Sequence, residues 1–95
     1  MAYFDPRMVI SPKTSIEEGS VNVVHDRGEW RGGDGWSGWS VAELTWEGEP
    51  AVGIRWNVGE NSVGNPQSRG VPTWFISPSA IAHLVLNQAQ TRKAD

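Results

Sequence analysis

Two runs of alternating apolar residues, separated by a turn sequence, constrain the fold of this chain more than any other feature. The runs "WSVAELTW" (39–46) and "AVGIRWNV" (51–58) flank "EGEP", in which Gly48 and Pro50 are typical turn residues. Apolar residues occupy every second position over much of each run, which is the period of a half-buried strand. The segment 39–58 is therefore predicted to be a β-hairpin.

The register of this hairpin follows if the apolar residues of both strands lie on one buried face. The expected cross-strand pairs are Leu44–Ile54, Ala42–Trp56 and Trp46–Val52. This register leaves a three-residue loop, a common hairpin length. It also sets Glu43 opposite Arg55 on the other face, where an opposite-charge pair contributes about 0.2–1 kcal/mol. We expect Trp46 and Trp56, together with Trp74 of a later strand, in the core.

In this register residue 39 lies beside residue 59, so the alignment of the two strands is expected to bring two long loops to one end of the molecule. The segment "RGEWRGGDGWSGWS" (27–40) runs into the first strand, and "GENSVGNPQSRGV" (59–71) leaves the second. Disordered segments are poor in aromatic residues, so Trp30, Trp36 and Trp39 argue against disorder in the first loop. The glycines let this loop bend, and its tryptophans hold it either to the core of the protein or to a ligand.

The remaining chain adds short strands and one terminal helix. "RMVIS" (7–11), "SVNVVHD" (20–26) and "PTWFIS" (72–77) are predicted strands, the first at an edge. The segment 77–93 is predicted to be a helix, with Ser77 as its cap and Pro78 at its first position. One stripe of this helix is formed by Ile81, Leu84, Val85 and Gln88, with Ala82, Leu86 and Ala89 beside it. Arg92 and Lys93 suit the C-terminal end of this helix.

These elements predict a mainly β protein with one C-terminal helix, folded as a single domain over residues 1–95. About five short strands suit a small SH3-like barrel, because a sheet of this size must close or have its edges covered.

Composition limits the classes of function. The chain has 95 residues, a net charge of −3, 11 acidic and 8 basic residues, and no Cys. This charge argues against general nucleic-acid binding, which favours a basic stripe. The absence of disulfides favours the cytoplasm, and the chain shows neither a signal peptide nor an apolar run long enough to cross a membrane.

Chemical motifs are sparse. In "HDRGE" (25–29) a His lies beside carboxylates, but adjacent strand residues point to opposite faces. Two His, no Cys and no suitably spaced carboxylates predict no metal site, and we expect no cofactor and no catalytic residues. The segment "GNPQSRG" (64–70) carries donors for a carboxylate, phosphate or peptide backbone, namely Asn65, Gln67, Ser68 and Arg69. The alternative is a loop whose side chains bind its own carbonyl groups.

Two resemblances accompany these patterns. "RGVPTWFI" (69–76) resembles the last strand of SH3 domains, and this resemblance implies a barrel. The peptide-binding residues of SH3 domains have no counterparts here, so no PxxP groove is implied. "GIRWN" followed by "GNPQSRGVPTWFI" (within 53–76) is similar to small uncharacterised proteins of mobile gene cassettes and phage-like elements. That resemblance implies a small accessory protein and supplies no activity.

The sequence favours a non-enzymatic binding or adaptor module that forms a homo-oligomer. Its ligand would be a protein, a peptide or a small polar molecule, bound at the shared loop end. The predicted binding residues are Trp30, Trp36, Trp39, Asn57, Asn65, Gln67 and Arg69. Two alternatives stay open: a small enzyme whose site forms between subunits, and a single-stranded nucleic-acid-binding protein.

Overall fold

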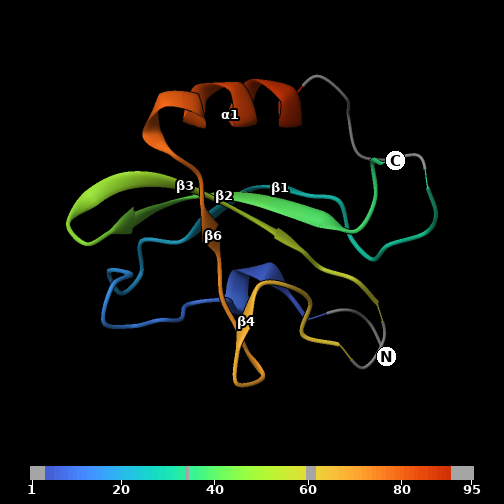
Figure 1. Cartoon of the computed structure of the whole chain (residues 1–95), viewed down its shortest axis with the longest axis horizontal. Helices are drawn as coiled ribbons and strands as arrows, with labels where there is room; N and C mark the ends of the chain where they lie inside the picture. Colours follow the sequence, from blue (N-terminus) through green and yellow to red (C-terminus); the bar gives the residue numbers. More distant parts are fainter. Residues whose placement is uncertain (1–3, 34, 60–61, 91–95) are drawn as a thin grey trace.

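A computed structural model describes residues 4–33, 35–59 and 62–90, and these form a mainly β protein with one C-terminal helix (Figure 1). The elements in chain order are η1 (Pro6–Met8), β1 (Asn22–Asp26), β2 (Trp39–Trp46), β3 (Glu49–Trp56), β4 (Gln67–Ser68), β5 (Val71–Pro72), β6 (Phe75–Ile76), η2 (Ser79–Ile81) and α1 (Ala82–Gln90). Four strands form an antiparallel sheet in the order β1-β2-β3-β6, and β4 and β5 form a separate hairpin.

The sheet has two edges, β1 and β6, which do not pair with each other within the described residues. A closed SH3-like barrel is therefore not confirmed. The predicted edge strand over 7–11 is wrong. Its first part belongs to η1, where Pro6 stands at the start and the Asp5 carboxylate accepts a hydrogen bond from the Arg7 backbone N–H. Ser11 forms only an isolated parallel bridge with Thr73.

The hairpin at 39–58 is confirmed, but its predicted register is wrong. The observed pairs are Leu44–Ala51, Ala42–Gly53, Val41–Ile54, Glu43–Val52 and Ser40–Arg55. The connection is a two-residue turn of Glu47 and Gly48, with φ of 50° and 85°. Positive φ at both central residues is the geometry that two-residue hairpin turns prefer. Glu43 therefore does not lie opposite Arg55, and the predicted charge pair across the strands does not form.

The register differs because both faces of the sheet are buried. On one face Ala42 and Leu44 pack with Val9, Ile16 and Trp74. The other face belongs to a second cluster, formed by Val41, Val52, Ala89 and the flanking Ile54, Ala82, Val85 and Leu86. A shift by an odd number of residues moves the apolar residues of a strand to the other face. Here that face is covered as well, so the apolar residues of β3 are not forced to join those of β2.

The tryptophans predicted as core divide accordingly. Trp74 is buried and its Nε1 donates to the Val9 carbonyl at 2.7 Å. Trp46 is half-buried against the first cluster. Trp56 is 53% exposed, so its assignment to the core is wrong. It follows Arg55 on β3 and lies on the α1 side of the sheet, beyond the part that the helix covers.

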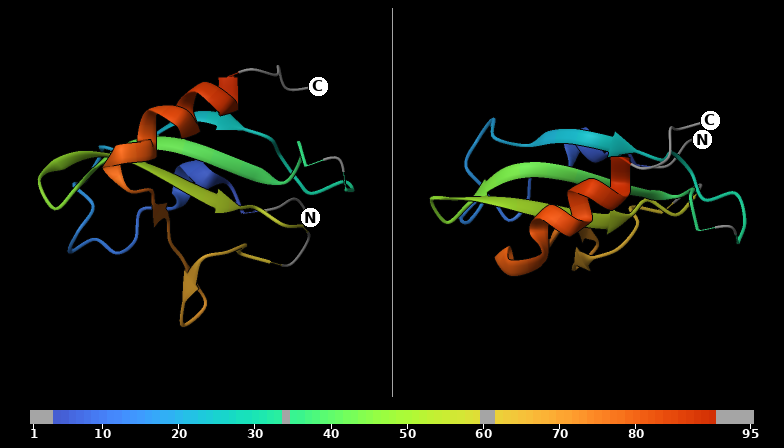
Figure 2. Two further views of the ribbon diagram at one scale, coloured as in Figure 1. Left: turned by 45° about the horizontal axis from the view of Figure 1, so that its top comes forward. Right: turned by 90° about the horizontal axis from the view of Figure 1, so that it is seen from above.

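The helix α1 crosses the second face of the sheet obliquely, over β2 and β3 (Figure 2). It begins later than predicted, because η2 precedes it and Ser77 does not cap it. The Ser77 N–H donates instead to the Val52 carbonyl at 2.9 Å. The predicted helix end at Arg92 and Lys93 lies outside the described residues. No helix in the described ranges is long and apolar enough to span a bilayer.

Candidate functional site: an apolar groove beside the loop end

The two long loops meet at one end of the sheet, as predicted (Figure 1). The Asn57 N–H donates to the Gly38 carbonyl at 2.6 Å, and the Trp30 N–H donates to the Val58 carbonyl at 3.0 Å. We derived this meeting from the predicted register, which is wrong, but the meeting itself does not require that register. The two strands of a hairpin run side by side, so the segments that enter one and leave the other emerge at the same end of the sheet.

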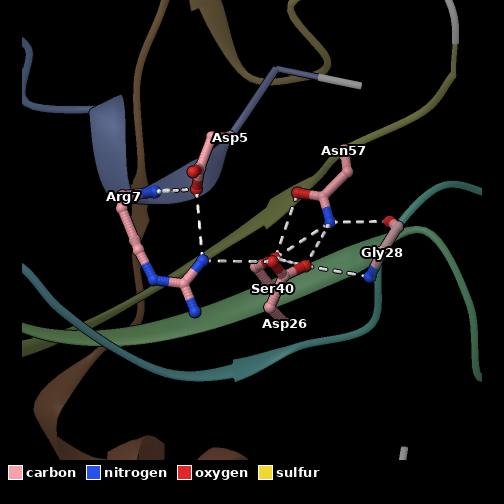
Figure 3. A network of polar contacts seen from close by, with 6 residues as sticks. All are labelled: Asp5, Arg7, Asp26, Gly28, Ser40 and Asn57. Carbon is pink, nitrogen blue, oxygen red and sulfur yellow. Dashed lines mark hydrogen bonds and ion pairs between the residues drawn. The ribbon is translucent and has the colours of Figure 1, made fainter. Parts of the chain in front are cut away.

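A buried polar network fastens this end (Figure 3). The fully buried Asn57 amide donates to the Gly28 carbonyl at 2.8 Å and to Ser40 Oγ at 2.9 Å. The Asp26 carboxylate accepts from the Gly28 N–H at 2.8 Å and lies 3.3 Å from Ser40 Oγ. Arg7 Nη1 approaches the same carboxylate at 3.6 Å. Asn57 therefore ties the loop to β1 and β2 from within, and its position does not suit contact with a ligand.

A second buried contact explains Trp36 and Trp39. The Arg27 guanidinium lies 5.5 Å from the Trp36 ring centroid and 5.6 Å from that of Trp39, a cation–π arrangement. Arg27 is 5% exposed, and its Nη2 donates to the Ala89 carbonyl near the end of α1 at 2.7 Å. Trp39 Nε1 also donates to the Gly35 carbonyl at 2.9 Å. Both rings thus hold the loop to the body of the protein, whereas Trp30 is 53% exposed.

The other predicted site residues do not gather around these tryptophans. Asn65 exchanges two backbone hydrogen bonds with Trp56, at 2.7 and 2.9 Å. Gln67 Nε2 donates to the Gly64 carbonyl at 3.1 Å, as expected for a loop that satisfies its own groups. Arg69 is exposed in the turn of the β4–β5 hairpin, which projects from the side of the sheet opposite α1 (Figure 1). Gln67 and Arg69 therefore lie apart from the Trp-rich loop.

An apolar groove of about 840 Å³ lies between α1 and the C-terminal half of β3. It is lined by Gly35, Trp39, Val41, Ile54, Arg55, Trp56, Asn65, Pro66, Phe75, Ile81, Leu84, Val85, Gln88 and Ala89. Four of its large apolar side chains are substantially exposed: Trp56 (53%), Phe75 (55%), Ile81 (44%) and Leu84 (55%). Ligand sites commonly have this size and this apolar character.

Sequence reasoning placed Trp39 and Asn65 in the binding surface, and both line the groove. It missed the helix wall and Trp56, which it assigned to the core. The sequence held one indication of the helix wall. The stripe that contains Ile81, Leu84 and Gln88 lies on a different side of the helix from the stripe that contains Ala82, Leu86 and Ala89. A helix with apolar residues on two sides has two surfaces to cover.

Arg55 positions the chain segment that carries Asn65 and Pro66 beside the groove. Its Nη1 donates to the Thr73 carbonyl at 2.6 Å, and its Nη2 donates to the Val63 carbonyl. These bonds hold the chain on both sides of Asn65 and Pro66. Burial lowers the pKa of the Arg55 guanidinium to about 10, and no carboxylate of the described residues lies within ion-pair distance of it. A buried cation of this kind positions this segment through its hydrogen bonds to carbonyl groups.

The segment around His25 and Asp26 lies outside the groove. Burial and, second, the charge of Arg27 lower the pKa of His25, which favours the neutral imidazole at neutral pH. The neighbouring Asp26 carboxylate is engaged in the buried network. Within the described ranges, no group of three or more His, Cys, Asp or Glu could hold a metal ion.

No protein-family model matches the chain, and neither a curated protein nor a solved structure matches it.

Proposed function

We propose that this protein is a non-enzymatic binding module, and that its binding surface is the apolar groove beside α1. The observation that carries this proposal is the exposure of Trp56, Phe75, Ile81 and Leu84 along one concavity. Exposed apolar surface is unfavourable at about 25 cal/mol per Å². Contiguous apolar patches on a folded protein commonly mark interaction sites. The ligand class is an apolar segment of a partner protein.

The composition of the groove favours binding over catalysis. Among its described lining residues, Arg55 is the one titratable side chain, and its pKa lies far from neutrality. General acid–base catalysis favours a group whose pKa lies near the working pH. The small-enzyme alternative therefore finds no support in the groove. A cytoplasmic location, an SH3-like barrel and the kinship with mobile-cassette proteins stay predictions.

The fluorescent probe 8-anilinonaphthalene-1-sulfonate, which brightens in apolar sites, tests the proposal. We expect it to bind the wild-type protein and to shift the backbone amide signals of Trp56, Phe75 and Leu84 in NMR spectra. Leu84→Glu should weaken this binding at least about tenfold, because a carboxylate in an apolar groove opposes the apolar contact.

Val71→Glu is the matched control. Val71 is an exposed apolar residue (47%) on β5, outside the groove, so this variant should bind the probe as the wild type does. Equal binding by both folded variants, or no probe binding at all, would show that the groove is not a binding surface.

A further inference from the structure

We infer that the occupant of the groove is an amphipathic α-helix of another protein, lying alongside α1. This inference rests on the proposed function and deepens it, because it names the secondary structure and the source of the bound segment.

The helical segment 79–90 presents apolar residues on two sides. Its Ala82, Val85, Leu86 and Ala89 pack with the apolar cluster on the sheet. A second stripe, of Ile81, Leu84 and Gln88, lines the groove. Residues spaced i, i+3 and i+7 form a continuous ridge on a helix, and such ridges pack into the grooves of a neighbouring helix. The stripe therefore has the spacing of a helix-packing surface.

The helix α1 leaves part of its face of the sheet uncovered. Strands lie about 4.8 Å apart, and a helix with its side chains is about 10 Å across, so one helix covers about two strands. The helix α1 lies over β2 and β3 and crosses them obliquely (Figure 2). It leaves open the strip that carries Trp56, Pro66 and Phe75. One further helix would cover that strip.

The backbone near the groove offers an extended peptide few free hydrogen-bonding groups. Strand addition derives its affinity from backbone hydrogen bonds along a free edge. The edge strand β6 has only two residues, Phe75 and Ile76. The end of β3 already pairs with Asn65 through Trp56. Recognition here must therefore come from side chains, as it does when a helix lies in a groove.

The exposed apolar area of the groove is smaller than the area that a stable dimer of this chain would need. About half of each of the four exposed side chains faces solvent, or roughly 400 Å² at about 150–250 Å² for each large side chain. A standard protein interface needs about 800 Å² from each partner. The rest of the α1 surface is polar and exposed, with His83, Asn87 and Gln90. A second copy could therefore offer only the stripe of Ile81, Leu84 and Gln88 that lines its own groove, and this stripe is too small for a stable dimer.

The scarcity of charged residues in the groove indicates the character of the partner helix. The one charged residue in the described lining is Arg55, which is only 3% exposed. The partner helix should therefore present a row of large apolar residues to the groove. Its binding should depend weakly on salt, because salt screens charges and leaves apolar contacts largely intact.

Two peptide libraries, screened against the full chain, test this inference. Both contain peptides of about 15 residues, or about four helical turns, with Leu, Ile, Met or Phe in an Ala, Gln and Lys background. The first places the apolar residues at i, i+3 and i+7 and is locked in the helical state by side-chain staples. The second has the same composition in strict alternation. Affinities are measured by fluorescence anisotropy with the 8-anilinonaphthalene-1-sulfonate assay in parallel.

We expect the helical library to yield binders with Kd of about 1–100 µM, a range typical of short peptides in small grooves. Leu84→Glu should raise Kd at least about tenfold, Val71→Glu should leave it unchanged, and raising NaCl from about 0.1 to 0.5 M should change it less than about threefold.

The outcomes separate the inference from the proposed function. Equal or better binding by the alternating library would overturn the helix inference and leave the groove as a site for an extended segment. Fluorophore binding without peptide binding from either library would also overturn it, and would leave the binding-module proposal standing. A dimer in light scattering that Leu84→Glu dissociates would assign the groove to a second copy. Failure of 8-anilinonaphthalene-1-sulfonate to bind at the groove of the wild-type protein would refute both the helix inference and the binding-module proposal.

Discussion

Gly38 shows, at the scale of single residues, why one segment combines glycines with tryptophans. Its φ is 85°, and a Cβ built there would lie 2.6 Å from the Trp30 Cβ and 2.7 Å from the Trp30 Cα. The backbone of Trp30 thus packs directly on Gly38. A residue without a side chain is required because of both the left-handed conformation and the close approach.

Gly38→Ala should lower the free energy of unfolding by about 3 kcal/mol, as the sum of a conformational cost of about 1–2 kcal/mol and an overpacking cost of about 1–3 kcal/mol. Gly48→Ala is the control, since Gly48 has the same φ of 85° but nothing within 4 Å of its Cβ position. It should cost about 1–2 kcal/mol. Urea denaturation measures both, and equal losses would mean that the Trp30 contact is unimportant.

Asn57 shows that a single polar residue in a sequence does not reveal its bonding partner. It follows the strand β3 directly and sequence reasoning placed it on the binding surface, but it is fully buried and bonded to Ser40 and Gly28. An isolated polar residue in a sequence does not reveal whether its partner will be water, a ligand or the protein itself. The partners of Asn57 come from β1, β2 and the loop between them.

At the scale of elements, the contact between the 27–38 loop and α1 connects the groove to the rest of the fold. Arg27 lies against Trp36 and Trp39 and donates to the Ala89 carbonyl. A cation near the C-terminal end of a helix also interacts favourably with the helix dipole. The wall of the groove is therefore held in place by a loop that precedes it by some 50 residues of chain.

Arg27→Lys should destabilise the protein by about 1–3 kcal/mol, because lysine keeps the charge but loses the planar stacking and the fork of donors. Hydrogen exchange of the amides in the last turn of α1 should accelerate with it. The control Arg31→Lys changes an exposed residue and should stay within about 0.5 kcal/mol of the wild type. Unchanged stability and exchange in Arg27→Lys would show that Arg27 does not anchor the helix.

At the scale of the whole molecule, burial and ion pairing decide how many of the arginines can contact a ligand. Arg27 and Arg55 are buried, and Arg7 is paired with Asp5 and Asp26. Arg7, Arg31 and Arg69 are exposed among the described arginines, and Arg69 lies on the projecting β4–β5 hairpin. Binding of single strands relies on a continuous basic groove with aromatic residues along it. The described arginines do not form such a groove, because Arg27 and Arg55 are buried and Arg7 is paired with carboxylates.

A single-stranded oligothymidine of about 12 nucleotides should therefore leave the tryptophan fluorescence unchanged at about 0.1 M salt and protein concentrations up to about 100 µM, because few exposed cations remain to release counterions. The positive control is the helical peptide that binds the groove. Quenching by the oligonucleotide that disappears as salt is raised would instead favour the nucleic-acid alternative.

The sequence by itself determined the features that depend on neighbouring residues. The period of the runs around Gly48 predicted the hairpin, the valine-rich segment predicted β1, and the pattern after Pro78 predicted α1. It also predicted that the two long loops meet at one end, although the register from which this was derived is wrong; the existence of the hairpin is enough to bring them there.

Only the tertiary structure decided which faces are covered. Val9 and Ile16 cover one face of the sheet and α1 partly covers the other, and both segments are distant in sequence from the hairpin. That double coverage permits the observed register, leaves Trp56 exposed and creates the groove. The physical reason is that burial is a property of the assembled surfaces: an alternating pattern shows that a strand has an apolar face, but not which distant segment will cover it or how completely.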